Sequence, residues 1–137
     1  MSANPPSVRR RAFMDTSAFF AISNARDVQH PVARAIVNHL RRENWKLSTS
    51  NFIVAETHAL LLARAGRHVA ATTLAEIDRG DITIIRVSEA DEQRAREIIP
   101  QYDDKDFSLT DATSFAVMER LHITHAFAFD HTLRSSG

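Results

Sequence analysis

The sequence contains no cysteine, and this absence excludes disulfide bonds, zinc–thiolate sites and a cysteine nucleophile. The lack of thiols fits the reducing cytoplasm. No apolar run approaches the roughly 18 residues that a membrane-spanning helix requires. The opening residues, MSANPPSVRRRAF, include arginines but no long apolar stretch behind them, so we expect no secretory signal. We expect residues 1–7 to form a disordered, proline-containing tail.

The sequence also lacks a net charge, with 17 basic and 17 acidic residues. The charges are unevenly spread, because residues 1–47 hold eight Lys or Arg and three Asp or Glu, whereas residues 48–137 hold nine and fourteen. This overall balance does not indicate a strongly basic nucleic-acid-binding protein. Several arginines of the first third form either a local basic face or an ordinary solvated surface. They are Arg9, Arg10, Arg11, Arg34, Arg41 and Arg42.

The chain of 137 residues, 44% of them apolar, fits one domain with one core. Short apolar or β-branched stretches alternate with segments of helical periodicity. Strands are predicted at 11–15, 46–50, 82–88 and 123–130. Helices are predicted at 16–25, 30–43, 51–66, 67–80, 89–102 and 111–121, with Thr16 or Ser17 able to cap the first. This alternation predicts parallel strand pairing through right-handed crossovers, and therefore a three-layer α/β domain.

Acidic residues stand where several predicted elements leave the core. Two strands end in aspartate, at Asp15 in RAFMD and at Asp130 in AFAFD. Since sites in open parallel sheets form beyond the carboxyl ends of the strands, both carboxylates are expected at one crevice. Glu56 lies near the apolar stripe of its helix, where an unpaired carboxylate would be costly. Asp111 begins a helix that carries no charge for the next seven residues.

Each acid also has a purely structural interpretation. Asp15 fits a helix cap, Glu56 can reach water at the edge of its stripe, and Asp130 fits a turn. Asp111 fits a capping pattern with Ser108 in SLTD. Together, however, four packed carboxylates would repel and raise one another's pKa values. A divalent cation removes that repulsion, and oxygen ligands suit Mg²⁺ or Mn²⁺, which can activate a water for attack on phosphate.

Three stretches resemble the PIN-domain family of metal-dependent ribonucleases, and in particular the toxin subunits of bacterial VapBC toxin–antitoxin pairs. They are FMDTSAFFA, TSNFIVAETHALLLARAG and DKDFSLTDATSFAVMERLHITHAFAFDHTL, which span about residues 11–133. The resemblance implies a single three-layer α/β/α PIN-like domain over residues 1–137. It also implies a mainly parallel central sheet of about four to five strands.

The resemblance implies that an acidic quartet is catalytic and holds one or two Mg²⁺ or Mn²⁺ ions. Its members are Asp15, Glu56, Asp111 and Asp130. Asp15 and Asp111 would be the core metal ligands. Glu56 would complete the ligand set or position the attacking water, and Asp130 would bind the second metal or its waters.

Small polar residues near the first and third aspartates also match the family. Thr16, Ser17 and Ser114 are expected to orient the metal ligands or a water, the alternative being capping or backbone bonding within their helices. Asp106 is either a further ligand or an exposed loop acid. The end of the chain departs from the family, because DHTL replaces the usual D-x-H-F. We expect the family's final short strand to be absent, since the sequence stops at Gly137.

The resemblance implies a cytoplasmic, Mg²⁺-dependent endoribonuclease that cleaves RNA phosphodiester bonds by metal-activated water, leaving a 3′-hydroxyl and a 5′-phosphate. It would be the toxin of a toxin–antitoxin pair. Its expected partners are tRNA or another structured RNA, a cognate antitoxin protein and a second copy in a homodimer. The alternatives are a non-toxin PIN domain in RNA processing and a catalytically weak module that binds RNA or a protein.

Two other kinds of site are less favoured by the sequence. A phosphoryl-transfer enzyme with aspartate as nucleophile would have a second acid close to the first, and Asp15-Thr16-Ser17 lacks it. A zinc site would need three histidines on one face. The candidates His122, His125 and His131 are spread over a helix end and a strand, so their spacing alone is weak support.

Overall fold

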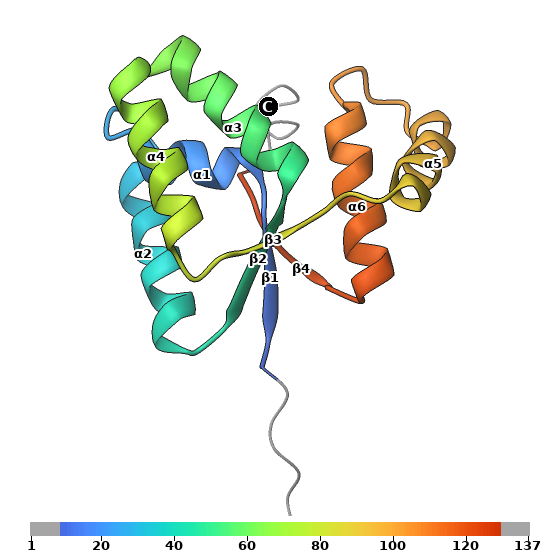
Figure 1. Cartoon of the computed structure of the whole chain (residues 1–137), viewed down its shortest axis with the longest axis horizontal. Coiled ribbons are helices and arrows are strands. Elements are labelled where there is room, and N and C mark those ends of the chain that lie inside the picture. Colours follow the sequence, from blue (N-terminus) through green and yellow to red (C-terminus); the bar gives the residue numbers. More distant parts are fainter. Residues whose placement is uncertain (1–8, 130–137) are drawn as a thin grey trace, which may run out of the picture.

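The computed structural model describes residues 9–129, in which a four-stranded, all-parallel sheet forms the middle layer (Figure 1). The strands lie in the order β3-β2-β1-β4. Their bounds are β1 (Arg11–Met14), β2 (Lys46–Ser50), β3 (Thr83–Ile85) and β4 (His125–Phe127). The expectations for residues 1–7, for Asp130 and for the segment after it lie outside the described residues.

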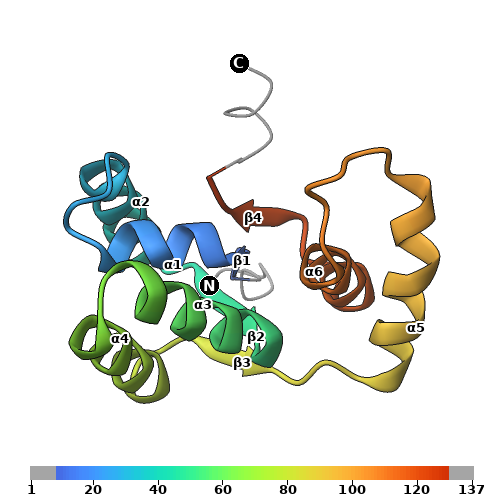
Figure 2. The same cartoon turned by 90° about the horizontal axis from the view of Figure 1, so that it is seen from above.

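Helices cover both faces of this sheet, as the view from above shows (Figure 2). One layer holds α1 (Thr16–Ser23), α2 (His30–Arg42), α3 (Asn51–Arg64) and α4 (Arg67–Arg79). The other holds α5 (Glu89–Ile98) and α6 (Leu109–Leu121), with α6 between the sheet and α5. A single 3₁₀ turn, η1 (Ile99–Gln101), follows α5. The three-layer α/β/α fold and the parallel sheet expected from the sequence are therefore confirmed.

The main core lies between the sheet and the helices that touch it. Phe13 and Met14 on the central strand are both 1% exposed, as expected for a parallel strand covered on both faces. Ile53 of α3 and Val117 of α6 pack into the same apolar cluster from opposite layers. Burying each such side chain contributes about 1.5–3 kcal/mol, so this cluster fixes α3 and α6 against the sheet.

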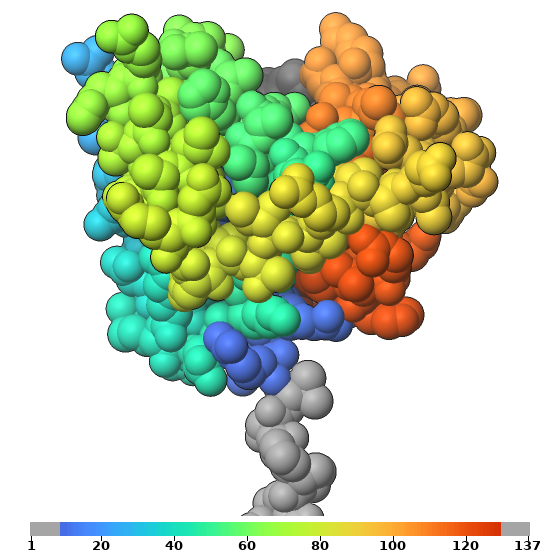
Figure 3. Space-filling model, viewed as in Figure 1, coloured from blue at the N-terminus to red at the C-terminus, as the bar shows by residue number. Residues whose placement is uncertain are grey.

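A smaller cluster joins α5 to α6. It contains Ala95, Ile98, Ala112 and Ala116, with Phe107 packed against it. The chain reaches α5 by a connection, residues 86–88, that runs in yellow across the front of the molecule (Figure 3). This crossover brings α5 to the far side of the sheet from α4.

Several predicted boundaries moved for local reasons. The third strand ends at Ile85 rather than at 88, because the backbone N–H of Val87 donates to Asn51 Oδ1 at 2.8 Å and Ser88 caps α5. The expectation that Thr16 or Ser17 caps the first helix was wrong, since Asp15 is its N-cap. Among the helices described, none is both long and apolar enough to cross a bilayer.

Candidate active site

A cavity of about 300 Å³ opens where β1 and β4 end and α6 begins. Asp15 and Asp111 both line it, as do Ser114 and the loop residues Asp104 and Asp106. Among the described residues that line this cavity there is no lysine or arginine. The cavity therefore has a strongly acidic wall at the sheet edge where open α/β folds place their sites.

Asp15 is held by contacts on both its backbone and its side chain. Its backbone N–H donates to Phe127 O at 3.1 Å, which extends the pairing of β1 with β4. Its Oδ2 accepts from the backbone N–H of Ser17 at 3.2 Å and from Ser17 Oγ at 2.8 Å. Ser17 Oγ in turn accepts from the N–H of Phe129 at 2.9 Å. Ser17 thus ties the carboxylate of Asp15 to the end of the chain segment that leads to Asp130.

Glu56 reaches the site from α3 through a neighbouring hydroxyl. The Thr16 hydroxyl donates a hydrogen bond to Glu56 Oε1. Burial raises the pKa of Glu56, and the charges of Asp15 and Asp111 raise it further, whereas hydrogen bonds from Thr16 and Thr110 oppose the shift. Glu56 is partly buried, so the alternative in which it reaches water at the edge of its stripe stays open. Glu56 is close enough for the charges of both aspartates to raise its pKa, although it does not line the cavity itself.

Asp111 occupies the third position of α6 in a capping box with Ser108. Its Oδ2 accepts from the N–H of Ser108 at 3.0 Å, and its own N–H donates to Ser108 Oγ at 3.0 Å. The capping pattern read from SLTD is therefore confirmed. Burial raises the pKa of Asp111 and the charges of Asp15 and Asp104 add to the effect, against the opposing hydrogen bonds from Ser108. Capping does not neutralise this carboxylate.

Ser114 lies one turn after Asp111, and its hydroxyl is buried without a hydrogen-bond partner. The backbone bonding within the helix considered for it is not observed among the described residues. A buried hydroxyl of this kind usually has a water or ligand as its partner. Ser114 also lines the cavity, so a water or ligand bound there is a candidate partner for its buried hydroxyl.

The donor set fits a hydrated divalent cation. Within residues 9–129, no three His, Asp or Glu side chains converge closely enough to hold an ion by themselves. Mg²⁺ does not need such a cage, because it keeps several waters and is commonly bound by one or two carboxylates and substrate phosphates. Asp15 and Asp111 supply two carboxylates and Ser114 a free hydroxyl for a bound water. Asp130, the remaining predicted ligand, lies outside the described residues.

Several contributors were not found from the sequence. Asp104 lines the cavity and raises the pKa of Asp111, and Thr110 lowers the pKa of Glu56, although neither was a candidate. Their closeness to Asp111 in the chain was the only available signal. Asp106, left open between ligand and loop acid, is exposed but also lines the cavity.

His131 lies outside the described residues, and the other histidines and the arginines considered earlier do not line the cavity. His122 ends α6 in a left-handed conformation with φ 56°, and His125 packs edge-on against Trp45 at 5.1 Å. Arg9 donates to the carbonyl oxygens of Asn44 and Trp45, at the opposite end of the sheet from the carboxylates. For Arg9, these contacts favour the interpretation as part of an ordinary surface.

The three-layer fold and the acidic cavity at the carboxyl edge of a parallel sheet are the features that we expected of a PIN-like domain. The model of the PIN domain matches residues 12–135, and the chain belongs to the PIN-domain family. The resemblance read from the sequence is thus confirmed.

The chain is similar to characterised members of that family. It is 35% identical over 131 residues to VapC20 of Mycobacterium tuberculosis, a 23S rRNA-specific endonuclease, covering 91% of this chain and 93% of that protein. It is 33% identical over 116 residues to a VapC ribonuclease of Archaeoglobus fulgidus, covering 82% of this chain and 72% of that protein. The crystal structure of M. tuberculosis VapC20, described as a sarcin–ricin loop cleaving toxin, superposes with a TM-score of 0.80 at 31% identity and covers 92% of this chain and 95% of that one.

Proposed function

We propose that this protein is a Mg²⁺- or Mn²⁺-dependent endoribonuclease and the toxin of a toxin–antitoxin pair. The observation that carries the proposal is the cavity on which Asp15 and Asp111 meet, with no lysine or arginine among its described lining residues. Family membership and the similarity to VapC nucleases support the same activity.

Each carboxylate has a distinct part in the proposed reaction. Asp15 and Asp111 would hold the ion, with Ser17 fixing the side chain of Asp15 and the capping box fixing that of Asp111. When bound, the ion would neutralise phosphoryl charge and make a water more acidic. Asp130 would bind a second ion or its waters, as the family resemblance implies.

Glu56 would position the attacking water and take up its proton. Its raised pKa suits that task, because a general base works best when its pKa lies closer to the working pH. The hydroxyl of Thr16 would hold the carboxylate in a fixed orientation. Attack of water on the phosphorus would break the bond to the 3′-oxygen and leave a 3′-hydroxyl and a 5′-phosphate.

The proposed substrate is an exposed, single-stranded loop of a structured RNA, because such loops make both phosphates and base edges accessible. The similarity to a 23S rRNA-specific endonuclease makes a large-subunit ribosomal RNA loop the first RNA to test, with tRNA as the second. A cognate antitoxin, a homodimer and a cytoplasmic location complete the proposal.

Cleavage of ribosomal RNA and tRNA should be measured with Mg²⁺, with Mn²⁺ and with EDTA. We expect cleavage that EDTA abolishes and that is lost in Asp15→Asn. Asp78→Asn is the matched control, since Asp78 is an exposed aspartate on α4 outside the cavity. Cleavage that persists in EDTA, or full activity in Asp15→Asn, would contradict the proposal.

A further inference from the structure

Three aromatic side chains gather beside the start of α6, and two of them are unusually exposed. Tyr102 is 47% exposed and Phe115 is 44% exposed. Tyr102 stacks on Phe107 with ring centroids 4.4 Å apart and an angle of 17° between the rings. Phe115 lies nearly parallel to both, with centroids 5.6 Å from Phe107 and 5.9 Å from Tyr102. We call these three rings the aromatic wall.

The aromatic wall is continuous with the acidic cavity. Phe107 and Phe115 line the same cavity as Asp15 and Asp111. Phe115 follows Asp111 by four residues on α6, so the ring and the carboxylate lie on one side of that helix. A molecule whose phosphate reaches the two carboxylates therefore brings its neighbouring groups against these rings.

One ring of the wall, that of Phe107, is also held in place by packing. Phe107 packs against the apolar cluster of Ala95, Ile98, Ala112 and Ala116 that joins α5 to α6. A ring fixed in this way loses little conformational entropy when a flat group stacks on it. Aromatic side chains commonly stack with the unpaired bases of single-stranded RNA.

The charges around the wall distinguish which part of an RNA it would contact. Asp106, an exposed carboxylate, lines the same cavity, so a phosphate placed against the rings would be repelled. A nucleobase is flat and carries no net charge, and it can stack there while the adjoining phosphate lies at Asp15 and Asp111. We propose that the aromatic wall is a stacking site for an unpaired base next to the scissile phosphate. This inference rests on the proposed nuclease function and adds a base-binding site to it.

The test compares Phe115→Leu, which keeps an apolar side chain but removes the ring, with Phe115→Tyr, which keeps the ring. Both are made in a Glu56→Gln background, which leaves Asp15 and Asp111 in place and slows cleavage during binding. Binding of a fluorescent RNA loop in Mg²⁺ is measured by anisotropy, with the loop intact or abasic at each position near the cut. Urea unfolding checks that each variant is folded.

Loss of one base stack should weaken binding by about 5- to 100-fold. We expect one abasic position to weaken RNA binding by this factor in the Glu56→Gln protein and in its Phe115→Tyr variant. Phe115→Leu should bind the intact loop as weakly as the abasic one, with no further loss from the abasic change. In cleavage assays with Glu56 intact, Phe115→Leu should act mainly on KM.

If the abasic change weakens RNA binding by the same factor with and without the Phe115 ring, the base-stacking inference is overturned. This outcome includes the case in which the aromatic wall binds a protein. Light scattering identifies one such case, in which the wall binds a second copy of this chain. Phe115→Leu would then lose the second copy, and the measured mass would fall. The inference is judged by binding and the nuclease proposal by cleavage. Wild-type protein that binds the loop through Phe115 but never cleaves RNA would contradict only the nuclease proposal.

Discussion

The first turns of α5 and α6 carry the same capping motif but place their aspartates in opposite electrostatic environments. In SEAD, Asp91 exchanges backbone and side-chain hydrogen bonds with Ser88 at 3.0 and 3.1 Å. In SLTD, Asp111 and Ser108 make the same pair of bonds, both at 3.0 Å. Both carboxylates also interact favourably with the partial positive charge at the N-terminus of their helix. Local structure therefore does not distinguish the two residues.

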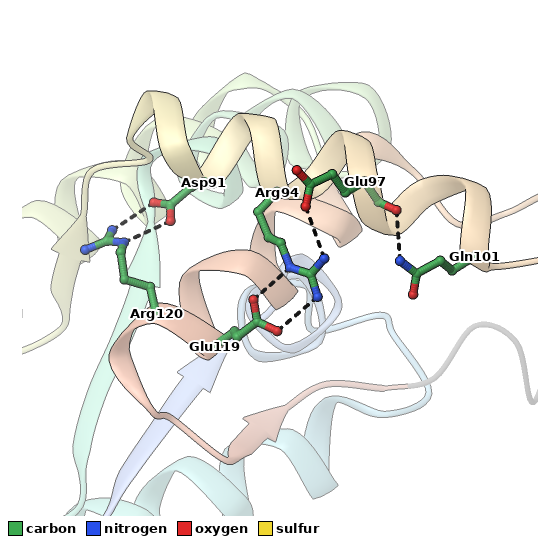
Figure 4. Close-up of polar contacts among 6 residues, drawn as sticks. All are labelled: Asp91, Arg94, Glu97, Gln101, Glu119 and Arg120. Carbon is green, nitrogen blue, oxygen red and sulfur yellow. Dashed lines mark hydrogen bonds and ion pairs between the residues drawn. The ribbon is translucent and has the colours of Figure 1, made fainter.

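Their neighbours distinguish them. Arg120 donates two hydrogen bonds of 2.8 Å to Asp91, which is only 2% exposed (Figure 4). These bonds lower the pKa of Asp91. Asp111 instead faces Asp15 and Asp104, and its pKa is raised by burial and by their charges. An aspartate whose charge is satisfied serves the fold, whereas one left among other acids is a candidate ligand for the proposed cation.

The largest expected effect comes from Asp111→Asn. The amide oxygen can still accept from the N–H of Ser108, so the cap is retained while the proposed metal ligand loses its charge. We expect RNA cleavage to fall by about 10³-fold, consistent with a loss of several kcal/mol of transition-state stabilisation. Single-turnover cleavage rates measure it, and a rate within a few-fold of wild type would break the distinction between the two aspartates.

The corresponding change on α5, Asp91→Asn, should act on stability instead. It leaves the guanidinium of Arg120 without its ionic partner, but that side chain is 41% exposed and can be partly solvated. We expect a loss of about 1–3 kcal/mol in the free energy of unfolding, measured in urea. Below the unfolding transition, the cleavage rate should stay at the wild-type value. A large loss of rate in folded protein would show that Asp91 also serves the reaction.

The pH dependence of stability should have opposite signs for the two variants. The lowered pKa of Asp91 stabilises the fold above the ordinary carboxyl range, and this stability is lost as the pH falls through the folded-state value. The raised pKa of Asp111 costs stability as the pH rises from the ordinary value through the folded-state value. Without metal at pH 7, Asp91→Asn should therefore unfold more easily and Asp111→Asn less easily than wild type.

The difference for Asp91→Asn should shrink as the pH falls below about 4, where unfolded aspartates take up protons. The difference for Asp111→Asn should shrink at higher pH, as the pH falls through the raised folded-state pKa towards about 4. Urea unfolding of the wild type and both variants, at a series of pH values in EDTA, gives the two curves. If both variants were more stable than wild type at pH 7, or both less stable, the environments assigned to Asp91 and Asp111 would be contradicted.

The smallest effect is expected from the exposed ion pairs beside Asp91. Arg94 contacts Glu119 at 2.9 Å and Glu97 at 3.3 Å, and all three side chains are between 39% and 58% exposed (Figure 4). Solvent screens such pairs, so Arg94→Ala should leave the unfolding midpoint close to wild type. The unfolding midpoints of Arg94→Ala and Asp91→Asn are compared in 0.5 M salt. We expect only Asp91→Asn, which changes a buried carboxylate, to retain a clear effect at about that ionic strength.

The fold could be predicted from the sequence because its signals are local. The alternation of apolar strands with periodic helices and the Ser108–Asp111 cap need only a few neighbouring residues. The hydrogen bond between Asp15 and Ser17 is equally local. The carboxylates Asp15, Glu56 and Asp111 were also identified as site candidates, because acids that follow strands or interrupt apolar stripes are unusual.

The remaining features depend on packing between distant segments. Nothing near Asp91 in the sequence indicates that Arg120, 29 positions later, would satisfy its charge. Likewise, the placement of Tyr102 against Phe107 and Phe115 follows from how α5 and η1 pack on α6. The unpaired hydroxyl of Ser114 could be recognised only once its surroundings were known. Sequence reasoning therefore identified Asp15, Glu56 and Asp111 as candidates, but not the residues that surround them, Asp104 included.

The most direct test is urea unfolding of the wild type, Asp91→Asn and Asp111→Asn during titration with Mg²⁺ and Mn²⁺. A cation that binds only the folded protein adds about 2.7 kcal/mol to the free energy of unfolding at 100 times its Kd. We expect this gain in the wild type and in Asp91→Asn, and little or none in Asp111→Asn. Equal stabilisation of all three proteins, or none in the wild type, would contradict the assignment of Asp111 to a cation site.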